Sequence, residues 1–249
     1  MAQNKVVLIT GSSRGIGAQT AQRFAQAGYA VVLNYRQAKK EAEELQQQIQ
    51  AIGVECCAVQ ADVTKESDVS ELFAQADNLG RLSVLVNNAG ILKQQARVAD
   101  ISAERFMQVM EVNILSCLLC TQQAIKRMST EQGGAGGAIV NVSSLAAKTG
   151  SPNEYVDYAA SKGAMDSFTR GAALELAEEG IRVNAVRPGL IYTDIHASGG
   201  EPDRVNRLKH KLPLQRGGEP EEVAEAIYWL ASEQSSYTTG TLLDVAGGL

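Results

Sequence analysis

Short apolar runs alternate with longer segments of helical periodicity along the whole chain, and this alternation is the strongest constraint on its fold. Seven runs rich in apolar and β-branched residues are expected as strands, at 5–9, 30–34, 55–60, 82–88, 137–144, 181–188 and 241–245. Six segments with apolar residues at helical spacing lie between them, at 15–27, 38–51, 67–79, 103–129, 155–178 and 219–232. Strands that are apolar throughout are buried on both faces. The pattern therefore predicts an α/β fold, a doubly wound seven-stranded parallel sheet with helices on both faces.

Length and charge narrow the class of protein. A chain of 249 residues with 45% hydrophobic residues can bury one large core, so we expect residues 1–249 to form a single domain. Acidic residues outnumber basic ones by 28 to 23, which argues against nucleic acid or an anionic membrane as a partner. The first apolar run is too short for a signal peptide, and no apolar stretch reaches 18 residues. We expect a cytoplasmic protein.

The four cysteines include a C-x-x-C pair, Cys117 and Cys120. Such a pair can be part of a redox or metal site. Here it lies in a segment typical of a buried helix, without a histidine or acidic residue at ligand spacing, so we interpret both as core residues. Cys56 and Cys57 are adjacent in an expected strand and should point to opposite faces. No metal site is predicted.

A glycine-rich turn, TGSSRGIG at 10–17, joins the first expected strand to the first expected helix. Glycine at 11, 15 and 17 allows the backbone to approach a pyrophosphate, and a helix N-terminus offers free N–H groups to it. The spacing is GxxxGxG and not the more common GxGxxG, so taken alone it fits a plain tight turn equally well. Its place between strand and helix favours a dinucleotide site.

The end of the second expected strand indicates which dinucleotide is bound. NAD sites usually place an acid there, whereas this chain has LNYRQAKK at 33–40. Arg36 and, in the glycine-rich turn, Arg14 can together bind a 2′-phosphate. The alternative is that Arg36 is a solvated loop residue. We expect NADP (NADPH), with NAD less favoured.

Tyr158 and Lys162 stand four residues apart in the segment EYVDYAASKGAMDSF, residues 154–168. Residues four apart share one face of a helix, so the Lys162 ammonium can lie near the Tyr158 phenol. A nearby cation favours phenolate and lowers a pKa that is ordinarily about 10. The pair is therefore suited to acid/base catalysis of carbonyl reduction.

Five motifs occur in order: TGSSRGIG, NNAG at 87–90, VNVSS at 140–144, YAASK at 158–162 and RPGLIYT at 187–193. Together they resemble the short-chain dehydrogenase/reductase family over essentially the whole chain. Within the family, the amino-acid sequences at 150–164 and 191–204 are most similar to bacterial glucose 1-dehydrogenase-like members. The resemblance implies a Rossmann-like fold and an NADP-dependent oxidoreductase that transfers a hydride between a nicotinamide cofactor and a small polar carbonyl or secondary alcohol.

The resemblance also implies roles for four side chains. Tyr158 is the expected acid/base, and Ser144, at the end of the fifth strand, orients the carbonyl. Lys162 binds the nicotinamide ribose and lowers the Tyr158 pKa. Asn113 supports a water that relays protons.

Further motif residues are expected at the cofactor by the same resemblance. Those after the third strand match the adenine contact, the NNAG motif borders the adenosine ribose, and the RPGLIYT motif meets the nicotinamide carboxamide. Each also fits ordinary strand-end capping or turn chemistry. The expected cofactor-binding set is Gly11, Ser13, Arg14, Gly15, Ile16, Gly17, Arg36, Asp62, Val63, Asn88, Ala89, Gly90, Pro188, Gly189, Ile191 and Thr193.

Two assignments have rivals in the sequence. Ser143 competes with Ser144, but alternation along a strand sends the two to opposite faces. Tyr155 competes with Tyr158; it lies seven residues from Lys162 and is interpreted as a packing or substrate-wall aromatic. The interval of fourteen residues from Ser144 to Tyr158 is one longer than in many relatives and predicts a bulged loop at SPNE, 151–154.

A polar insert at about 193–218 follows the sixth expected strand and is predicted to be a substrate lid. It carries both histidines and several basic residues but few large apolar ones, which favours a small polar substrate. The alternative, that these charges form a solvated helix face, remains open.

Other functions remain to be weighed. A non-catalytic NADP-sensing protein would use the glycine-rich turn and Arg36, but would not need Ser144, Tyr158 and Lys162 together. A 3-oxoacyl-carrier-protein reductase would need basic docking loops, whereas Glu131, Glu178 and Glu179 occupy them here. A serine hydrolase is disfavoured because VNVSS, the motif that carries Ser144, lacks the G-x-S-x-G elbow of such a nucleophile. Apolar and small residues on several faces of 103–129 and 155–178 predict a homotetramer, since these helices form subunit contacts in relatives.

Overall fold

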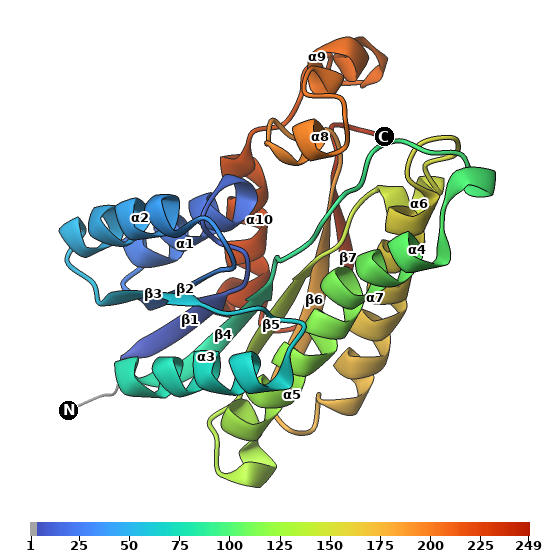
Figure 1. Cartoon of the computed structure of the whole chain (residues 1–249). Coiled ribbons are helices and arrows are strands. Elements are labelled where there is room, and N and C mark those ends of the chain that lie inside the picture. Colours follow the sequence, from blue (N-terminus) through green and yellow to red (C-terminus); the bar gives the residue numbers. More distant parts are fainter. Residues whose placement is uncertain (1–3) are drawn as a thin grey trace.

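The computed structural model describes residues 4–249, so residues 1–3 of the expected 1–249 domain lie outside the described residues. Seven strands form one parallel sheet in the order β3-β2-β1-β4-β5-β6-β7 (Figure 1). Their bounds are β1 Lys5–Ile9, β2 Ala30–Tyr35, β3 Cys56–Gln60, β4 Arg81–Asn87, β5 Gly137–Val142, β6 Ile181–Pro188 and β7 Leu242–Val245. The predicted fold class is confirmed.

Helices cover both faces of this sheet. The long helices α1, α2 and α10 lie on one face, and α3, α5 and α7 lie on the other (Figure 1). Within residues 4–249, none of the helices combines the length and apolar character needed to cross a membrane. The α-helices are α1 Gly15–Gln26, α2 Lys39–Ala51, α3 Glu66–Leu79, α4 Ala103–Met110, α5 Ser116–Met128, α6 Ala146–Thr149, α7 Val156–Glu175, α8 Ile195–Ser198, α9 Arg204–Leu208 and α10 Pro220–Ala231.

Strand β1 shows why its sequence is apolar at every position. Val6 and Leu8 point into the core beneath α3, α5 and α7, whereas Val7 and Ile9 point into the core beneath α1, α2 and α10. All four are completely buried. Each face of the strand therefore gains the free energy of burying apolar side chains, which a continuous apolar run allows and an alternating one does not.

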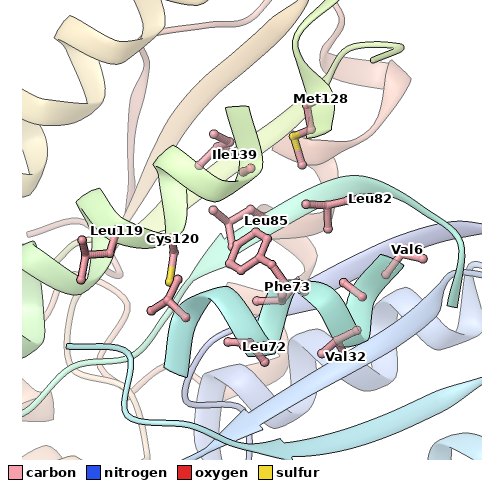
Figure 2. Packing of buried hydrophobic residues seen from close by; sticks show 14 of the residues in the cluster. Val6, Val32, Leu72, Phe73, Leu82, Leu85, Leu119, Cys120, Met128 and Ile139 are labelled. Atoms are coloured by element: carbon pink, nitrogen blue, oxygen red, sulfur yellow. The ribbon is translucent and has the colours of Figure 1, made fainter. Parts of the chain in front are cut away.

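The cysteines take the core positions predicted for them. Cys120 packs in the apolar cluster around Phe73 (Figure 2), and Cys117 is buried one turn away on α5. Burial raises the pKa of the Cys117 thiol to about 12, so it stays protonated at neutral pH. Cys56 and Cys57 on β3 face the two opposite cores, as strand alternation requires.

The segment predicted as one helix at 103–129 is interrupted. A π-helical turn, Glu111–Leu115, separates α4 from α5. Asn113 lies in this turn with its side chain fully buried, and its amide pairs with both backbone groups of Ile91, accepting from N at 2.7 Å and donating to O at 3.1 Å. Hydrophobic periodicity cannot reveal such a turn, because the extra residue is accommodated by hydrogen bonds to a distant loop.

The strand order reverses at β1, which pairs with β2 on one side and β4 on the other. Chain segments leaving the carboxyl ends of β1 and β4 then turn to opposite faces of the sheet. A crevice forms at such a reversal, and ligands of open α/β sheets bind there.

Candidate active site

A cavity of about 720 Å³ lies at the carboxyl ends of the strands. Its volume falls within the range typical of small-molecule sites. Of the residues predicted for the site, only Gly17 and Asn113 do not line it. The remaining predicted residues are brought together from the ends of β1, β2, β3, β4, β5 and β6, from helix α7 and from the segment after β6.

The glycine-rich turn packs directly against the NNAG loop. Gly11 has a positive φ of +60°, and a Cβ there would lie 2.9 Å from the Ala89 Cα atom. A Cβ on Gly17 would lie 2.5 Å from Asn88 Nδ2, which donates to the backbone oxygens of Thr10 and Gly11 at 2.9 and 2.8 Å. Gly17 therefore acts behind the cavity wall, where it allows close packing.

The N-terminus of α1 is suited to an anion. The helix begins at Gly15, its first turn contains no acidic residue, and no side chain caps it. The first N–H groups of a helix have no partner within it and carry the positive end of the helix dipole. These features fit the pyrophosphate of a dinucleotide.

The adenosine end of the cavity carries two arginines. Arg36 follows β2 directly, with 58% of its side chain exposed, and lines the cavity together with Arg14. Its guanidinium lies 3.9 Å from the Asp62 carboxylate. Although burial alone would raise the pKa of Asp62, hydrogen bonds from Thr64 and the charge of Arg36 lower it. Asp62 is thus held as an anion beside a guanidinium that retains access to solvent.

Tyr158, Lys162 and Ser144 meet at the other part of the cavity. Tyr158 and Lys162 lie on successive turns of α7, and the Lys162 ammonium is 5.6 Å from the centre of the Tyr158 ring. Lys162 Nζ donates to the Val142 carbonyl at 2.7 Å, which fixes its long side chain in the interior. Ser144 follows β5 and lines the same cavity as the phenol.

Burial has a strong effect on both titratable groups. It raises the pKa of the Tyr158 phenol, and a hydrogen bond with Ser144 opposes the rise. It lowers the pKa of Lys162 to about 8, against raising contributions from Cys117 and Asp166. The pKa of Tyr158 is therefore raised on balance, and the contribution that opposes the rise comes from Ser144. Lowering by Lys162 stays a prediction.

The two serines face in different directions. Ser143 Oγ donates to Asp166 Oδ1 at 2.7 Å, and the residue is almost completely buried. Ser144 Oγ accepts from the Ala146 N–H at 3.1 Å and remains beside Tyr158. Their opposite orientation agrees with strand alternation and favours Ser144 as the substrate contact.

Tyr155 is packed into the wall of the same cavity. It is 3% exposed, its hydroxyl donates to the Gly199 carbonyl at 3.2 Å, and the Arg204 guanidinium lies 5.2 Å from its ring centre. The loop before it contains Ser151 and Asn153 with positive φ, at the place where the sequence predicted a bulge.

Asn113 stands behind the site. Its amide also donates to Ser161 Oγ at 3.0 Å, so the π-helical turn is bound both to α7 and to the loop after β4. A Cβ on Gly90 would lie 3.4 Å from Asn113 Oδ1 and 3.5 Å from Lys162 Nζ. The backbone at Gly90 therefore approaches both groups closely, while the proton-relay role of Asn113 stays a prediction.

Comparison with known proteins agrees with this geometry. The family model described as enoyl-(acyl carrier protein) reductase matches residues 11–249. The chain is 52% identical to the "uncharacterized oxidoreductase YgfF" of Escherichia coli, over 98% of this chain and 99% of that one. It is 36% identical to "glucose 1-dehydrogenase 2" of Bacillus subtilis, over 98% and 94% of the two chains.

A solved structure resembles the whole fold. The 3-ketoacyl-(acyl-carrier-protein) reductase of Brucella melitensis, complexed with NADH, superimposes with a TM-score of 0.90 at 34% identity, covering 98% of this chain and 97% of that one. The chain belongs to the short-chain dehydrogenase/reductase family. It is thus an NAD(P)-dependent oxidoreductase, with a Rossmann-like fold.

Two polar residues that organise this dehydrogenase/reductase site were missed in the sequence. Asn34 on β2 accepts from the Gly11 N–H at 3.0 Å and donates to the Ala61 carbonyl at 3.0 Å, so it ties the glycine-rich turn to the end of β3. The Thr10 hydroxyl accepts from the N–H groups of Asn88 and Ala89, both at 3.0 Å. A polar residue inside an otherwise apolar strand was the available signal for Asn34.

The segment at 193–218 follows β6 and carries α8 and α9 above the sheet (Figure 1). Its basic residues are mostly paired or solvated. Arg204 donates to Glu154 at 2.5 and 2.9 Å and to Glu201 at 3.0 Å, and Arg207 also pairs with Glu201. Lys211 is exposed. The segment is therefore bound to the loop before α7 by an ion-pair network.

We expect Arg204 to hold this segment in place, because it bridges Glu201 within the segment and Glu154 outside it. Arg204→Met, which retains much of the side-chain stem, should speed hydrogen exchange of amides at 195–208 by roughly tenfold. The matched control is Arg207→Met, since Arg207 pairs only with Glu201 inside the segment. Equal acceleration by both variants would contradict the bridging role.

Proposed function

We propose that this enzyme uses NADP(H) to reduce a small polar carbonyl compound, or to oxidise the matching secondary alcohol. The observation that carries the proposal is the meeting of Tyr158, Lys162 and Ser144 in the same cavity as the glycine-rich turn and the N-terminus of α1. A protein that only senses NADP needs the turn and the arginines. It has no use for a phenol, an ammonium and a hydroxyl grouped beside them.

Different side chains transfer the proton and orient the substrate. When bound, the nicotinamide cofactor supplies or accepts the hydride at the substrate carbon. The Ser144 hydroxyl donates a hydrogen bond to the substrate oxygen, and the Tyr158 hydroxyl donates its proton to that oxygen during reduction. During oxidation, the Tyr158 phenolate takes the proton back. Lys162 binds the nicotinamide ribose, and Asn113 supports the water that relays protons.

Lys162 gives the reaction a pH dependence. Burial lowers its pKa to about 8, so the folded enzyme holds it mainly as ammonium at neutral pH. Its positive charge is lost as the pH rises through about 8, and with it the attraction for phenolate and ribose oxygens. Reduction also needs the Tyr158 proton, which the phenol retains through this range because burial raises its pKa, so the pH dependence comes from Lys162.

NADP is proposed because no acid follows β2 and two arginines line that end of the cavity. Arg36 and Arg14 offer charged donors to a 2′-phosphate, which NAD lacks. The Brucella melitensis relative was crystallised with NADH, so family membership alone leaves the choice between the two cofactors open.

A small free substrate is favoured over one attached to a carrier protein. Thr130 N donates to the Glu179 carbonyl at 3.0 Å, which brings the loop after α5 beside the end of α7. Glu131 and Glu178 are exposed on these two loops. Their charges repel an acidic carrier, which slows its encounter with the enzyme and weakens the complex.

We also propose that residues 1–249 act as one NADP-binding domain, with 193–218 as the substrate lid, and that the chain assembles as a homotetramer. Helices α4, α5 and α7 and the π-helical turn expose large apolar side chains at Met107, Leu115, Leu118 and Leu174. Large apolar side chains gathered on helix surfaces are typical of subunit contacts.

Tyr158→Phe should remove most of the turnover while NADPH binding stays near the wild-type value, because only the transferable proton is lost. Turnover is measured by NADPH absorbance with a panel of diketones and aldoses, and binding by NADPH fluorescence. The matched control is Tyr155→Phe, which removes one hydroxyl that bonds Gly199. Normal turnover in Tyr158→Phe, with loss in the control, would show that Tyr155 is the acid/base.

Arg36→Ala should weaken NADPH binding by roughly tenfold or more and leave NADH binding nearly unchanged, because a charged hydrogen bond to the 2′-phosphate is removed. Dissociation constants for both cofactors come from fluorescence titration. Lys40→Ala, in an exposed residue that pairs with Glu44, is the control for a general change of charge. Equal losses for NADPH and NADH would place Arg36 outside the phosphate site.

Light scattering at micromolar concentration should give a mass of four chains, since burying the exposed apolar side chains of α4, α5 and α7 stabilises the assembly. Leu174→Glu should reduce the mass, because it places a charge among these contacts. Glu178→Gln, nearby on the same exposed surface, should not. A monomeric wild type would reject the proposed assembly.

A further inference from the structure

We propose that Asp166 and Arg187 form a positioning pair behind the Ser144–Tyr158–Lys162 site, holding the site segments in register and supplying a negative charge close to Lys162. This inference rests on the proposed function, because it concerns how the same site works. It assigns a role to two buried charged residues that the reaction itself does not touch.

The pair is buried and has well-formed geometry. Arg187 donates to Asp166 Oδ2 through Nε at 2.9 Å and through Nη2 at 2.7 Å. The side chains are only 12% and 6% exposed. The other carboxylate oxygen, Asp166 Oδ1, accepts from Ser143 Oγ at 2.7 Å. Both oxygens of the carboxylate therefore have a donor, so the buried charge is fully compensated by hydrogen bonds.

These contacts join segments that each carry a site residue. Ser143 directly precedes Ser144 after β5, and its hydroxyl also lies 3.3 Å from the Lys162 carbonyl oxygen. Asp166 lies one helical turn after Lys162 on α7. Arg187 directly precedes Pro188, which lines the cavity at the end of β6. One carboxylate thus connects the ends of β5 and β6 to the helix that carries Tyr158.

The network continues to β7 and α6. Arg187 Nη1 donates to Asp244 Oδ1 on β7 at 3.5 Å, and Lys148 Nζ donates to Asp244 Oδ2 at 2.7 Å. Lys148 lies on α6, between Ser144 and α7. The two acids and two bases alternate, so each charge lies beside an opposite one, and the end of β7 is tied to the loop that leads from Ser144 to Tyr158.

Stability alone does not explain a buried pair of this kind. Replacing a buried ion pair by apolar residues of similar size is often neutral or stabilising, because two charges must be removed from water. The position of Asp166 supplies another reason. Lys162 Nζ contacts the Val142 carbonyl and lies near the Tyr158 ring, and the titratable groups whose charges act on it are Cys117 and Asp166. Burial keeps Cys117 and Tyr158 neutral at pH 7, so Asp166 is the anion among these groups.

The two members of the pair therefore act on Lys162 with opposite signs. The Asp166 charge stabilises the ammonium. Its loss leaves the Arg187 cation with only its longer contact to Asp244, and so favours neutral Lys162. Loss of the Arg187 charge leaves Asp166 free to attract Lys162 and favours the ammonium. A purely structural pair has no such asymmetry, since removing either member only loosens the same contact.

The test measures the dissociation constant of NADPH by fluorescence from pH 6 to 10 in the purified enzyme. The wild type should bind more weakly as Lys162 loses its proton, and Lys162→Met should abolish this transition. Asp166→Asn should move the transition to lower pH by roughly 0.5 to 1 unit, and Arg187→Gln should move it to higher pH. The double variant, which leaves neither charge, should show a smaller downward shift than Asp166→Asn.

The matched control is Asp77→Asn, which removes the acid from the bidentate Asp77–Arg127 pair on α3 and α5, at 2.7 and 2.8 Å. This variant should keep the wild-type transition. Circular dichroism shows whether Asp166→Asn folds. If it does not, the direction in which the pH transition moves is taken from Arg187→Gln and the double variant.

Two outcomes would overturn the inference in distinguishable ways. Folded Asp166→Asn and Arg187→Gln variants that both keep the wild-type transition, or shift it in one direction, would overturn the pair and leave the proposed function intact. A wild type that does not bind NADPH, or whose transition survives in Lys162→Met, would overturn the proposed function at Lys162, and the pair with it.

Discussion

The burial of β1 on both faces is the constraint from which the site follows. Because Val6 and Leu8 enter one core and Val7 and Ile9 the other, helices must pack on both sides of the sheet. The strand order then reverses at β1, and the segments leaving β1 and β4 diverge. The cavity forms where they part, so its place is a consequence of how the hydrophobic core is divided between two faces.

Within that crevice, the backbones of neighbouring loops pack directly against each other. The glycine-rich turn reaches the NNAG loop so closely that Gly11 and Gly17 have no room for a Cβ. Backbone polar groups at this contact are paired by Thr10, Asn34 and Asn88. Their pairing satisfies buried donors and acceptors locally and leaves the first turn of α1 open for an anion.

Charge is distributed in two layers around the cavity. The outer layer, formed by Arg204 with Glu154 and Glu201, attaches the 193–218 segment to the body of the protein. The inner layer, centred on Asp166 and Arg187, lies behind Lys162. Lys162 itself is kept in the interior by the Val142 carbonyl. Burial, which removes this ammonium from water, has the largest effect on its pKa, and Cys117 and Asp166 oppose that effect.

Strand and helix periodicity was enough to predict the sheet, both covered faces and the core position of Cys120, because burial of apolar side chains follows directly from residue order. Most residues of the motifs line one cavity, since parallel strands end at one edge of the sheet. Three features depended on contacts between distant segments. The π-helical turn at Asn113 needs Ile91, the orientation of Ser143 needs Asp166, and the pairing of Arg204 needs Glu154. Only the tertiary structure decides these, because a hydrogen bond between residues far apart in the chain leaves no periodic trace in the sequence.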